Sequence, residues 1–284
     1  MSDFEDYWDS VDAELAQLPP QPVRDLVPRR CTADFTGYEV RLTSLGPYRI
    51  FGYLSVPTGP GPYPAVLTTP RYGSVNNPPH YNDRLRYVTL VIAHRGQRTA
   101  DSSYAAAYPG LLTDGIADPD RYVYRGIVAD CLRAAEYLTA LPEVDTSRVA
   151  VAGDDLAVLT AARRPLFAAL QVAGAPLFRG AGQPDADYPA AEFGDHLRAH
   201  PQDADAMRRT LALFDPERHA PAVTAAARVE IPGVGGPLSA LAEALDAHRY
   251  APTHHGQADN DAADAWLAVR LGAAAMSRFS RMAG

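Results

Sequence analysis

The sequence predicts one α/β domain, residues 1–284, with a mostly parallel central sheet, helices on both faces and a small cap. Short apolar runs bounded by turn residues are typical of buried strands, and long amphipathic stretches between them are typical of helices. Strands that alternate with helices form parallel βαβ units. The chain has 284 residues, of which 47% are hydrophobic and 21% charged, so it can bury a sizeable core.

The predicted elements follow the hydrophobic pattern along the chain. Apolar residues at helical spacing from Phe4 to Leu18 predict an N-terminal helix within residues 1–20, which packs on the domain or on a neighbouring subunit. A second helix is expected over residues 120–141 and a third from Val158. Residues 180–213 are predicted to form a reduced cap over the pocket. Strands are expected at 38–42, 48–56, 65–69, 87–93, 148–152 and near 229–234, and a turn at 142–147.

The charge balance and the cysteines limit which partners and which cellular compartment are expected. A net charge of −8 provides no basic face for nucleic acid or an anionic membrane, so we expect neither as a partner. No apolar run is long enough to span a membrane, and Met1 to Trp8 do not resemble a secretion signal. Cys31 and Cys131 have no metal-like spacing, which favours free thiols in a reducing, cytoplasmic compartment. No residue cluster implies a metal or another cofactor.

Residues 149–157 read Val-Ala-Val-Ala-Gly-Asp-Asp-Leu-Ala, an apolar strand followed by a tight turn and a helix start. This is the frame of the nucleophile elbow of α/β-hydrolases, in which small residues flank a central nucleophile. Here the central residue is Asp155, between Gly153 and Ala157. A helix N-terminus favours negative charge at this point. The alternative interpretation is that Asp155 only caps the following helix.

Further motifs occur along nearly the whole chain, from Asp3 to about Phe279. They are Asp3-Phe4-Glu5-Asp6-Tyr7-Trp8; Pro64-Ala65-Val66; His94-Arg95-Gly96-Gln97; Tyr122-Val123-Tyr124-Arg125-Gly126 with Asp130; Leu141 to Asp145 with Arg148; Phe214-Asp215 to Ala220-Pro221; and Tyr250 to His255. Together they resemble the acetyl xylan esterase and cephalosporin C deacetylase family. The resemblance implies an α/β-hydrolase fold and a site built for acetyl esters. It also implies a homo-oligomer.

The resemblance also implies roles for individual residues. His255 or His254 stands where the family has its catalytic histidine. The backbone N–H groups of Tyr72 and Leu156 correspond to an oxyanion hole. Arg71 and Tyr104 are expected beside the substrate, together with Tyr108. Structural roles are expected for the remaining motif residues, which are Arg95, Gly96, Gln97, Arg125 and Asp130.

The sequence departs from the family where the chemistry is expected. The family elbow reads Gly-Gly-Ser-Gln-Gly-Gly, whereas residues 153–158 place Asp155 at the serine position. No acid occurs in residues 233–237, where the triad aspartate is expected, and the next aspartate is Asp246. The family's His-Gly-Tyr loop reads Arg71-Tyr72-Gly73. Acyl transfer through serine needs a hydroxyl, a base and an orienting acid, so we expect it to be absent.

Three functions remain open from the sequence. The first is an esterase-like lyase that eliminates acetate from an acetylated small molecule, with Asp155 or His255 as the general base. Such lyases occur in spirotetronate antibiotic biosynthesis, and the resemblance is to their degenerate site. The second is hydrolysis with Asp155 as nucleophile, as in haloalkane dehalogenases and epoxide hydrolases. The third is a catalytically inactive binding or scaffold protein.

Overall fold

Nine strands form one twisted sheet in the part of the chain that the computed structural model describes, which is residues 3–73, 78–95, 109–179, 187–232 and 238–277. Their order across the sheet is β1-β2-β3-β5-β4-β6-β7-β8-β9. β1, β2, β3 and β5 are antiparallel neighbours, and the strands from β5 to β9 pair in parallel. The strands are β1 Val23–Leu26, β2 Phe35–Thr43, β3 Arg49–Pro57, β4 Tyr63–Thr68, β5 Val88–Ile92, β6 Val144–Gly153, β7 Ala169–Val172, β8 Ala226–Glu230 and β9 His248–Tyr250.

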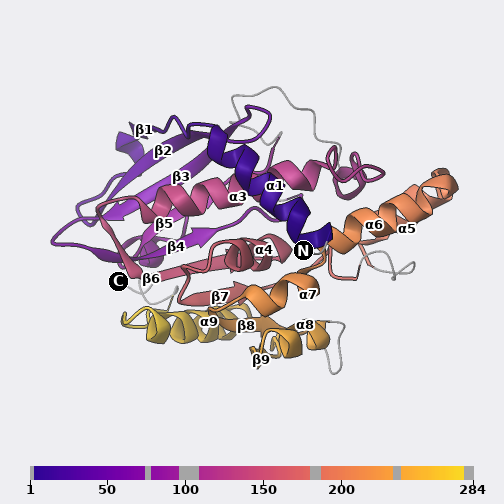
Figure 1. Ribbon diagram of the computed structural model, residues 1–284. Coiled ribbons are helices and arrows are strands. Elements are labelled where there is room, and N and C mark those ends of the chain that lie inside the picture. Colours follow the sequence, from indigo (N-terminus) through magenta and orange to yellow (C-terminus); the bar gives the residue numbers. More distant parts are fainter. Residues whose placement is uncertain (1–2, 74–77, 96–108, 180–186, 233–237, 278–284) are drawn as a thin grey trace.

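Helices cover both faces of this sheet (Figure 1). The α-helices are α1 Asp3–Gln17, α2 Tyr81–Arg84, α3 Val123–Thr139, α4 Asp155–Arg163, α5 Ala191–Ala199, α6 Ala204–Phe214, α7 Pro216–His219, α8 Leu238–Ala244 and α9 Gly256–Arg270. Short 3-10 helices are η1 Pro28–Arg30, η2 Leu111–Thr113, η4 Pro201–Asp203 and η5 Ala220–Ala222. None of the described helices combines the length and the apolar character that crossing a membrane requires.

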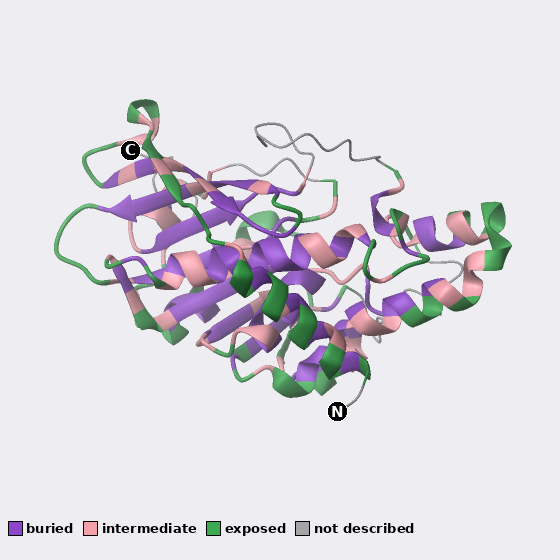
Figure 2. Ribbon diagram, turned by 45° about the horizontal axis from the view of Figure 1, so that its top comes forward, coloured by how far each residue is buried: buried purple, intermediate pink, exposed green. Residues whose placement is uncertain are grey.

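Alternation along the central strands explains the two layers of helices. Leu67 and Val151 point to one face and join a large core with α1, α3, α4 and α8. Val66 and Ala150, one position away, point to the other face and pack against Trp266 of α9. Successive side chains of a strand alternate between faces, so strands buried on both sides are apolar throughout. Figure 2 shows these strands as the buried centre of the molecule.

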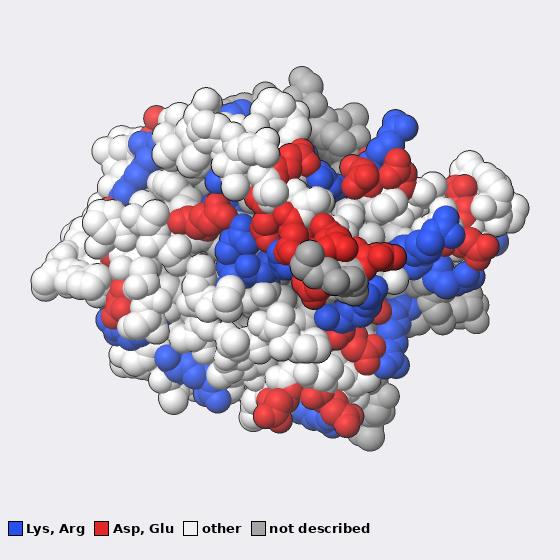
Figure 3. All heavy atoms as spheres, viewed as in Figure 1, with Lys and Arg blue, Asp and Glu red and all other residues white. Residues whose placement is uncertain are grey.

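Helix α1 packs on its own domain. Trp8 is completely buried, and its indole N–H donates to the Leu213 carbonyl at 2.9 Å. On the other side of the helix, Asp12 pairs with Arg163 and, at 2.9 Å, with Arg164. Figure 3 shows acidic side chains gathered over α1, next to basic ones. The amphipathic pattern of residues 1–20 thus has one face in the core and one face in surface ion pairs.

The expected α/β-hydrolase fold is confirmed, but several element bounds differ. The expected turn at residues 142–147 lies largely within β6, whose first residues include half-buried Asp145 and exposed Thr146 and Ser147. β1 was not predicted, because Val-Arg-Asp-Leu is an exposed edge strand without an apolar face. The predicted cap, residues 180–213, contains α5 and most of α6, which extend away from the sheet in Figure 1.

Candidate functional site

The candidate site lies where two parallel strands end side by side. Thr68 of β4 is opposite Ala152 of β6, and the Thr69 backbone N–H donates to the Ala152 carbonyl at 3.0 Å. Residues 70–73 leave β4 here, next to the turn from β6 into α4. Ligands of open α/β sheets bind at the carboxyl ends of the strands. These two connections are therefore the segments to consider.

The turn into α4 is closely packed around Gly153. A Cβ atom at this position would lie 2.0 Å from Thr69 Oγ1 and 3.5 Å from the Cβ atom of Ala157. The two small residues that flank Asp155 in the sequence therefore face each other across the turn. Small residues at these two positions are the pattern of a nucleophile elbow.

The backbone of the turn does not adopt the left-handed conformation at either aspartate. Asp154 has φ −113° and ψ −141°, and Asp155 is the first residue of α4. Neither has the positive φ found at four other non-glycine residues. A nucleophile elbow is strained because its turn presents the central side chain outward. In this chain Asp154 instead caps α4, and Asp155 turns inward.

Asp154 is a buried carboxyl group surrounded by donors. Its Oδ1 accepts a hydrogen bond from the Leu156 backbone N–H at 3.3 Å. Burial raises the pKa of Asp154 to about 6, although the N–H groups of Leu156 and Tyr72 and the charge of Arg71 lower it. The two backbone N–H groups expected to form an oxyanion hole, those of Leu156 and Tyr72, thus both stabilise the ionised Asp154 carboxylate. The group is ionised at neutral pH and is more basic than an ordinary aspartate.

Asp155, at the serine position, points into the interior. It is 1% exposed, and its Oδ2 accepts a hydrogen bond from the Leu177 backbone N–H at 2.7 Å. Its Oδ1 is buried without a partner among the described residues. Burial, followed by the negative charges of Asp154 and Asp215, raises the pKa of Asp155 well above its usual range. A carboxyl group in this environment holds its proton more tightly than an ordinary aspartate does.

The loop after β4 is held from the cap. The Tyr72 hydroxyl donates to Glu192 Oε1 in α5. The Tyr72 ring also packs edge-on against Tyr188, with ring centroids 5.5 Å apart. Arg71 is exposed, and Leu156 is buried. The expected substrate residue Tyr104, like Tyr108, lies outside the described residues.

The two candidate histidines lie at the N-terminus of α9. His254 and His255 are both exposed, and His254 has a positive φ of 61°. His255 caps α9, where its Nδ1 accepts from the Ala258 backbone N–H at 3.4 Å. No hydrogen bond or ion pair in the described parts of the chain joins either histidine to Asp155. The grouping of Asp155, His254 and His255 as catalytic residues thus stays a prediction from the sequence.

Residues 1–232 match the sequence model of the family described as Acetyl xylan esterase (AXE1). The match covers well over half of the 284 residues. The chain belongs to the acetyl xylan esterase family. The acetyl esterase Axe7A of Xylanibacter ruminicola is 28% identical over 163 residues, which make up 53% of this chain and 37% of that protein. The chain thus spans little more than a third of the length of this relative.

Two solved acetyl xylan esterases share the fold of this family member. The enzyme from Paenibacillus sp. R4 aligns with a TM-score of 0.77 at 24% identity, covering 90% of this chain and 89% of that one. Acetyl Xylan Esterase 1 from Thermoanaerobacterium sp. JW/SL YS485 also aligns with a TM-score of 0.77, at 19% identity, covering 95% and 94%. These similarities show the fold. They do not transfer the relatives' activity to a chain without the elbow serine.

Several family motif residues form contacts beside the site. Arg95 Nε and Nη2 donate to the two oxygens of the Asp130 carboxylate at 2.8 and 2.7 Å, and Asp130 is buried. A Cβ atom on Gly126 would lie 2.5 Å from the Arg95 guanidinium. Arg125 pairs with Glu14 of α1 at 2.6 Å. Gly96 and Gln97 lie outside the described residues.

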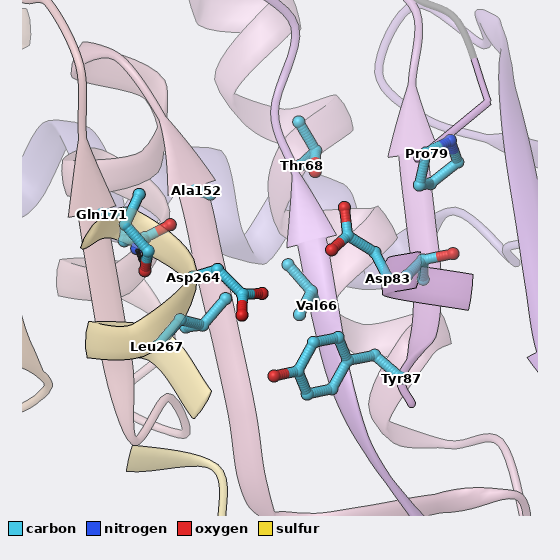
Figure 4. Close-up of a pocket in the computed structure, with 11 residues that line it drawn as sticks. Val66, Thr68, Pro79, Asp83, Tyr87, Ala152, Gln171, Asp264 and Leu267 are labelled. Atoms are coloured by element: carbon cyan, nitrogen blue, oxygen red, sulfur yellow. Dashed lines mark hydrogen bonds between the residues drawn. The ribbon is translucent and has the colours of Figure 1, made fainter. Parts of the chain in front are cut away.

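A hollow lies on the α9 face of the sheet. It has a volume of about 100 Å³, and Figure 4 shows the side chains of Asp83 and Asp264 around it. The Tyr87 hydroxyl and Thr89 Oγ1 line this hollow and are buried without a hydrogen-bond partner in the described residues. A polar space of this size holds about three water molecules. It is too small to replace the elbow as a substrate site.

Two residues of the site were missed from the sequence. The elbow pattern assigns importance to its central residue, Asp155, and the capping preference of aspartate was the only signal for Asp154. Glu192 has no local motif, because its partners are more than 75 positions away in the chain. Only the tertiary structure places this carboxylate against the Tyr72 loop.

Proposed function

We propose that this chain releases acetate from an acetylated small molecule by elimination, as a carbon–oxygen lyase, with Asp154 as the general base. The observation that supports the proposal is the Asp154 carboxyl group at the strand ends, with a pKa of about 6. A general base works best when its pKa lies near the working pH. Asp155, which was the expected base, is buried and points into the interior.

The reaction needs no nucleophile and no water. Asp154 takes a proton from the carbon next to the one that bears the acetoxy group. The electrons of the broken C–H bond form a C=C bond, the C–O bond breaks, and acetate leaves with its electron pair. The products are an alkene and acetate, and the proton on Asp154 then passes to solvent. A substrate with a carbonyl beside the acidic carbon fits this chemistry best.

The surroundings of Asp154 suit this role better than acyl transfer. Residues 153–157 contain no hydroxyl group that could form an acyl-enzyme. The pKa of Asp155, next in the chain, is raised by burial and by the charge of Asp154, so of the two neighbours Asp154 is the one favoured to carry the negative charge. Arg71 is exposed near Asp154 and provides positive charge for the departing acetate. The spirotetronate assignment and the cytoplasmic location stay predictions from the sequence.

Hydrolysis of an acetyl ester is the alternative that family membership favours. In that reaction Asp154 activates a water molecule, which attacks the acetyl carbonyl. The Leu156 and Tyr72 backbone donors are then required at the oxyanion, but both already act on Asp154. This competition for the same donors is the reason to rank elimination first.

Product analysis in water enriched in heavy oxygen separates these reactions. The protein is incubated with β-acetoxy ketones and, for comparison, para-nitrophenyl acetate, and the products are analysed by mass spectrometry. Elimination yields the unsaturated ketone and unlabelled acetate. Hydrolysis yields the alcohol and labelled acetate, and label in the Asp155 carboxylate indicates an aspartate nucleophile. No turnover of any ester would favour the scaffold hypothesis.

Variants test the assignment of the base. Asp154→Asn keeps the shape and capping ability of the side chain but removes the base, so turnover is expected to fall by about 10²–10⁴-fold. The matched control is Asp205→Asn, at an exposed aspartate of α6 paired with Arg208. Deuterium at the acidic carbon should slow the wild-type reaction, and the rate should rise with pH through about 6. Full activity of Asp154→Asn contradicts the proposal.

A further inference from the structure

A buried carboxylate in the cap bonds to the segments that surround the candidate site. Glu192, the second residue of α5, is 4% exposed. In the described part of the chain, no basic side chain forms an ion pair with it. A buried carboxylate without a cation is stable only when hydrogen-bond donors surround it. Its donors are therefore informative about what the cap holds in place.

The donors come from two segments distant in sequence. Glu192 Oε1 accepts from the Gly110 backbone N–H at 2.7 Å and from the Tyr72 hydroxyl. Glu192 Oε2 accepts from the Leu112 backbone N–H at 2.9 Å. One carboxylate thus ties α5 both to the loop after β4 and to the chain at η2.

Both segments also contact groups that influence the two aspartates. The Tyr72 backbone N–H stabilises the ionised form of Asp154 and so lowers its pKa. The Leu112 carbonyl accepts from the Tyr122 hydroxyl at 2.8 Å. Tyr122 is buried close to both carboxyl groups, since the charges of Asp155 and Glu192 add to the effect of burial in raising its pKa. Glu192 thus contacts the loop whose Tyr72 N–H stabilises ionised Asp154, and through Leu112 it is also linked to Tyr122.

We propose that Glu192 is a positioning residue, which holds the Tyr72 loop so that its backbone donor faces Asp154 and thereby couples docking of the cap to assembly of the site. This inference deepens the proposed function and rests on it for the role of Asp154. The simpler interpretation is that Glu192 only anchors α5. An anchor would affect stability without changing the titration of a side chain in another segment.

The test follows the Asp154 carboxyl group directly, by carbon NMR titration of the full chain labelled at aspartate. Tyr72→Phe removes the link to Glu192 without changing any charge. With the loop released, the Tyr72 N–H no longer stabilises the ionised form, so the Asp154 midpoint should rise by roughly half a unit to one unit. Glu192→Gln should change the midpoint in wild type more than it does in the Tyr72→Phe background.

Amide exchange and a matched control complete the experiment. Glu192→Gln replaces one acceptor oxygen with a donor, so exchange at Gly110 and Leu112 should speed up about tenfold. Asp195→Asn, at an exposed residue of the same helix, should leave both readouts unchanged. Faster exchange with an unmoved Asp154 midpoint in both variants would show that Glu192 is only an anchor, and would overturn the inference. A shifted midpoint in a protein that turns over no acetyl ester would instead contradict the proposed function.

Discussion

Asp154 combines two properties that rarely occur together in a capping residue. It caps α4 by accepting the Leu156 N–H, and burial raises its pKa from 3.8 to about 6. An exposed aspartate caps a helix without this change, because water solvates its charge. The raised pKa therefore records a free-energy cost of keeping an ionised carboxylate at this position near neutral pH.

Replacing Asp154 with asparagine should stabilise the protein at neutral pH. Because the folded-state pKa is raised, the contribution of Asp154 to stability is fully present below about pH 4 and is lost as the pH rises through about 6. Asparagine caps equally well and carries no charge, so Asp154→Asn should gain up to about 3 kcal/mol at pH 7. Urea unfolding between pH 4 and 8 measures this gain, which should disappear at the acid end. A gain that is the same at every pH would contradict the assigned cause.

At the scale of the element, α9 begins at a histidine that the family resemblance marks as catalytic. His255 accepts the Ala258 N–H through Nδ1, while Asp259 accepts from the Tyr250 hydroxyl at 2.7 Å and from the Thr253 backbone N–H at 2.8 Å. These bonds order the segment between β9 and α9. They also direct the imidazole of His255 along its own helix.

His255→Asn separates the capping role from a catalytic one. Asparagine is among the preferred capping residues, so the free energy of unfolding should stay within about 0.5 kcal/mol of wild type, whereas His255→Ala should lose about 1 kcal/mol. If capping is the role of His255, turnover of the acetyl esters should be retained in His255→Asn. Loss of turnover with an unchanged free energy of unfolding would instead support a catalytic role for His255. His254→Ala, at the neighbouring exposed position, serves as the control.

The turn between β6 and α4 depends on the absence of a side chain at Gly153. Gly153→Ala would place a methyl group 2.0 Å from Thr69 Oγ1, so we expect a loss of about 1–3 kcal/mol in the free energy of unfolding. Removing that oxygen with Thr69→Ala should make the same glycine substitution less costly. A thermodynamic double-mutant cycle by urea unfolding measures this coupling. Additive effects would mean that the backbone, and not Thr69, limits the position.

At the scale of the whole molecule, the sequence predicted those strands and helices that carry a clear apolar pattern. The central strands β4, β5 and β6 are mostly apolar where both of their faces are covered, as in residues 149–151 of β6, and this signal is local. β9, with only three residues His-Arg-Tyr, carries no comparable pattern. The candidate site was proposed from Gly153 and Ala157, but which aspartate faces the donors depends on the backbone of the turn. The role of Glu192 depends on contacts across the fold, which no local pattern encodes.

The docking of α9 on the sheet depends on one arginine between two carboxylates. Arg86 Nη1 donates to Asp264 Oδ2 at 3.2 Å and to the Ala274 carbonyl at 2.7 Å, and its Nη2 lies 3.3 Å from Asp83 Oδ1. The side chains of Arg86 and Asp264 are 9% and 7% exposed. The pair thus joins α9 and the chain after it to the segment between α2 and β5. These contacts lie within one chain and do not test the expected homo-oligomer, which stays a prediction.

Removing this arginine should be among the most damaging single changes outside the site. Arg86→Met preserves the apolar stem but leaves the buried Asp264 carboxylate without its partner, so we expect a loss of about 3–5 kcal/mol in the free energy of unfolding. Arg86→Lys should restore only part of this loss, because an ammonium group cannot reproduce the two-point contact with Asp264. Urea unfolding at pH 7 measures both variants. The double variant Arg86→Met with Asp264→Leu, which removes both charges, should be more stable than Arg86→Met alone; equal stability would show that the unpaired carboxylate is not the source of the loss.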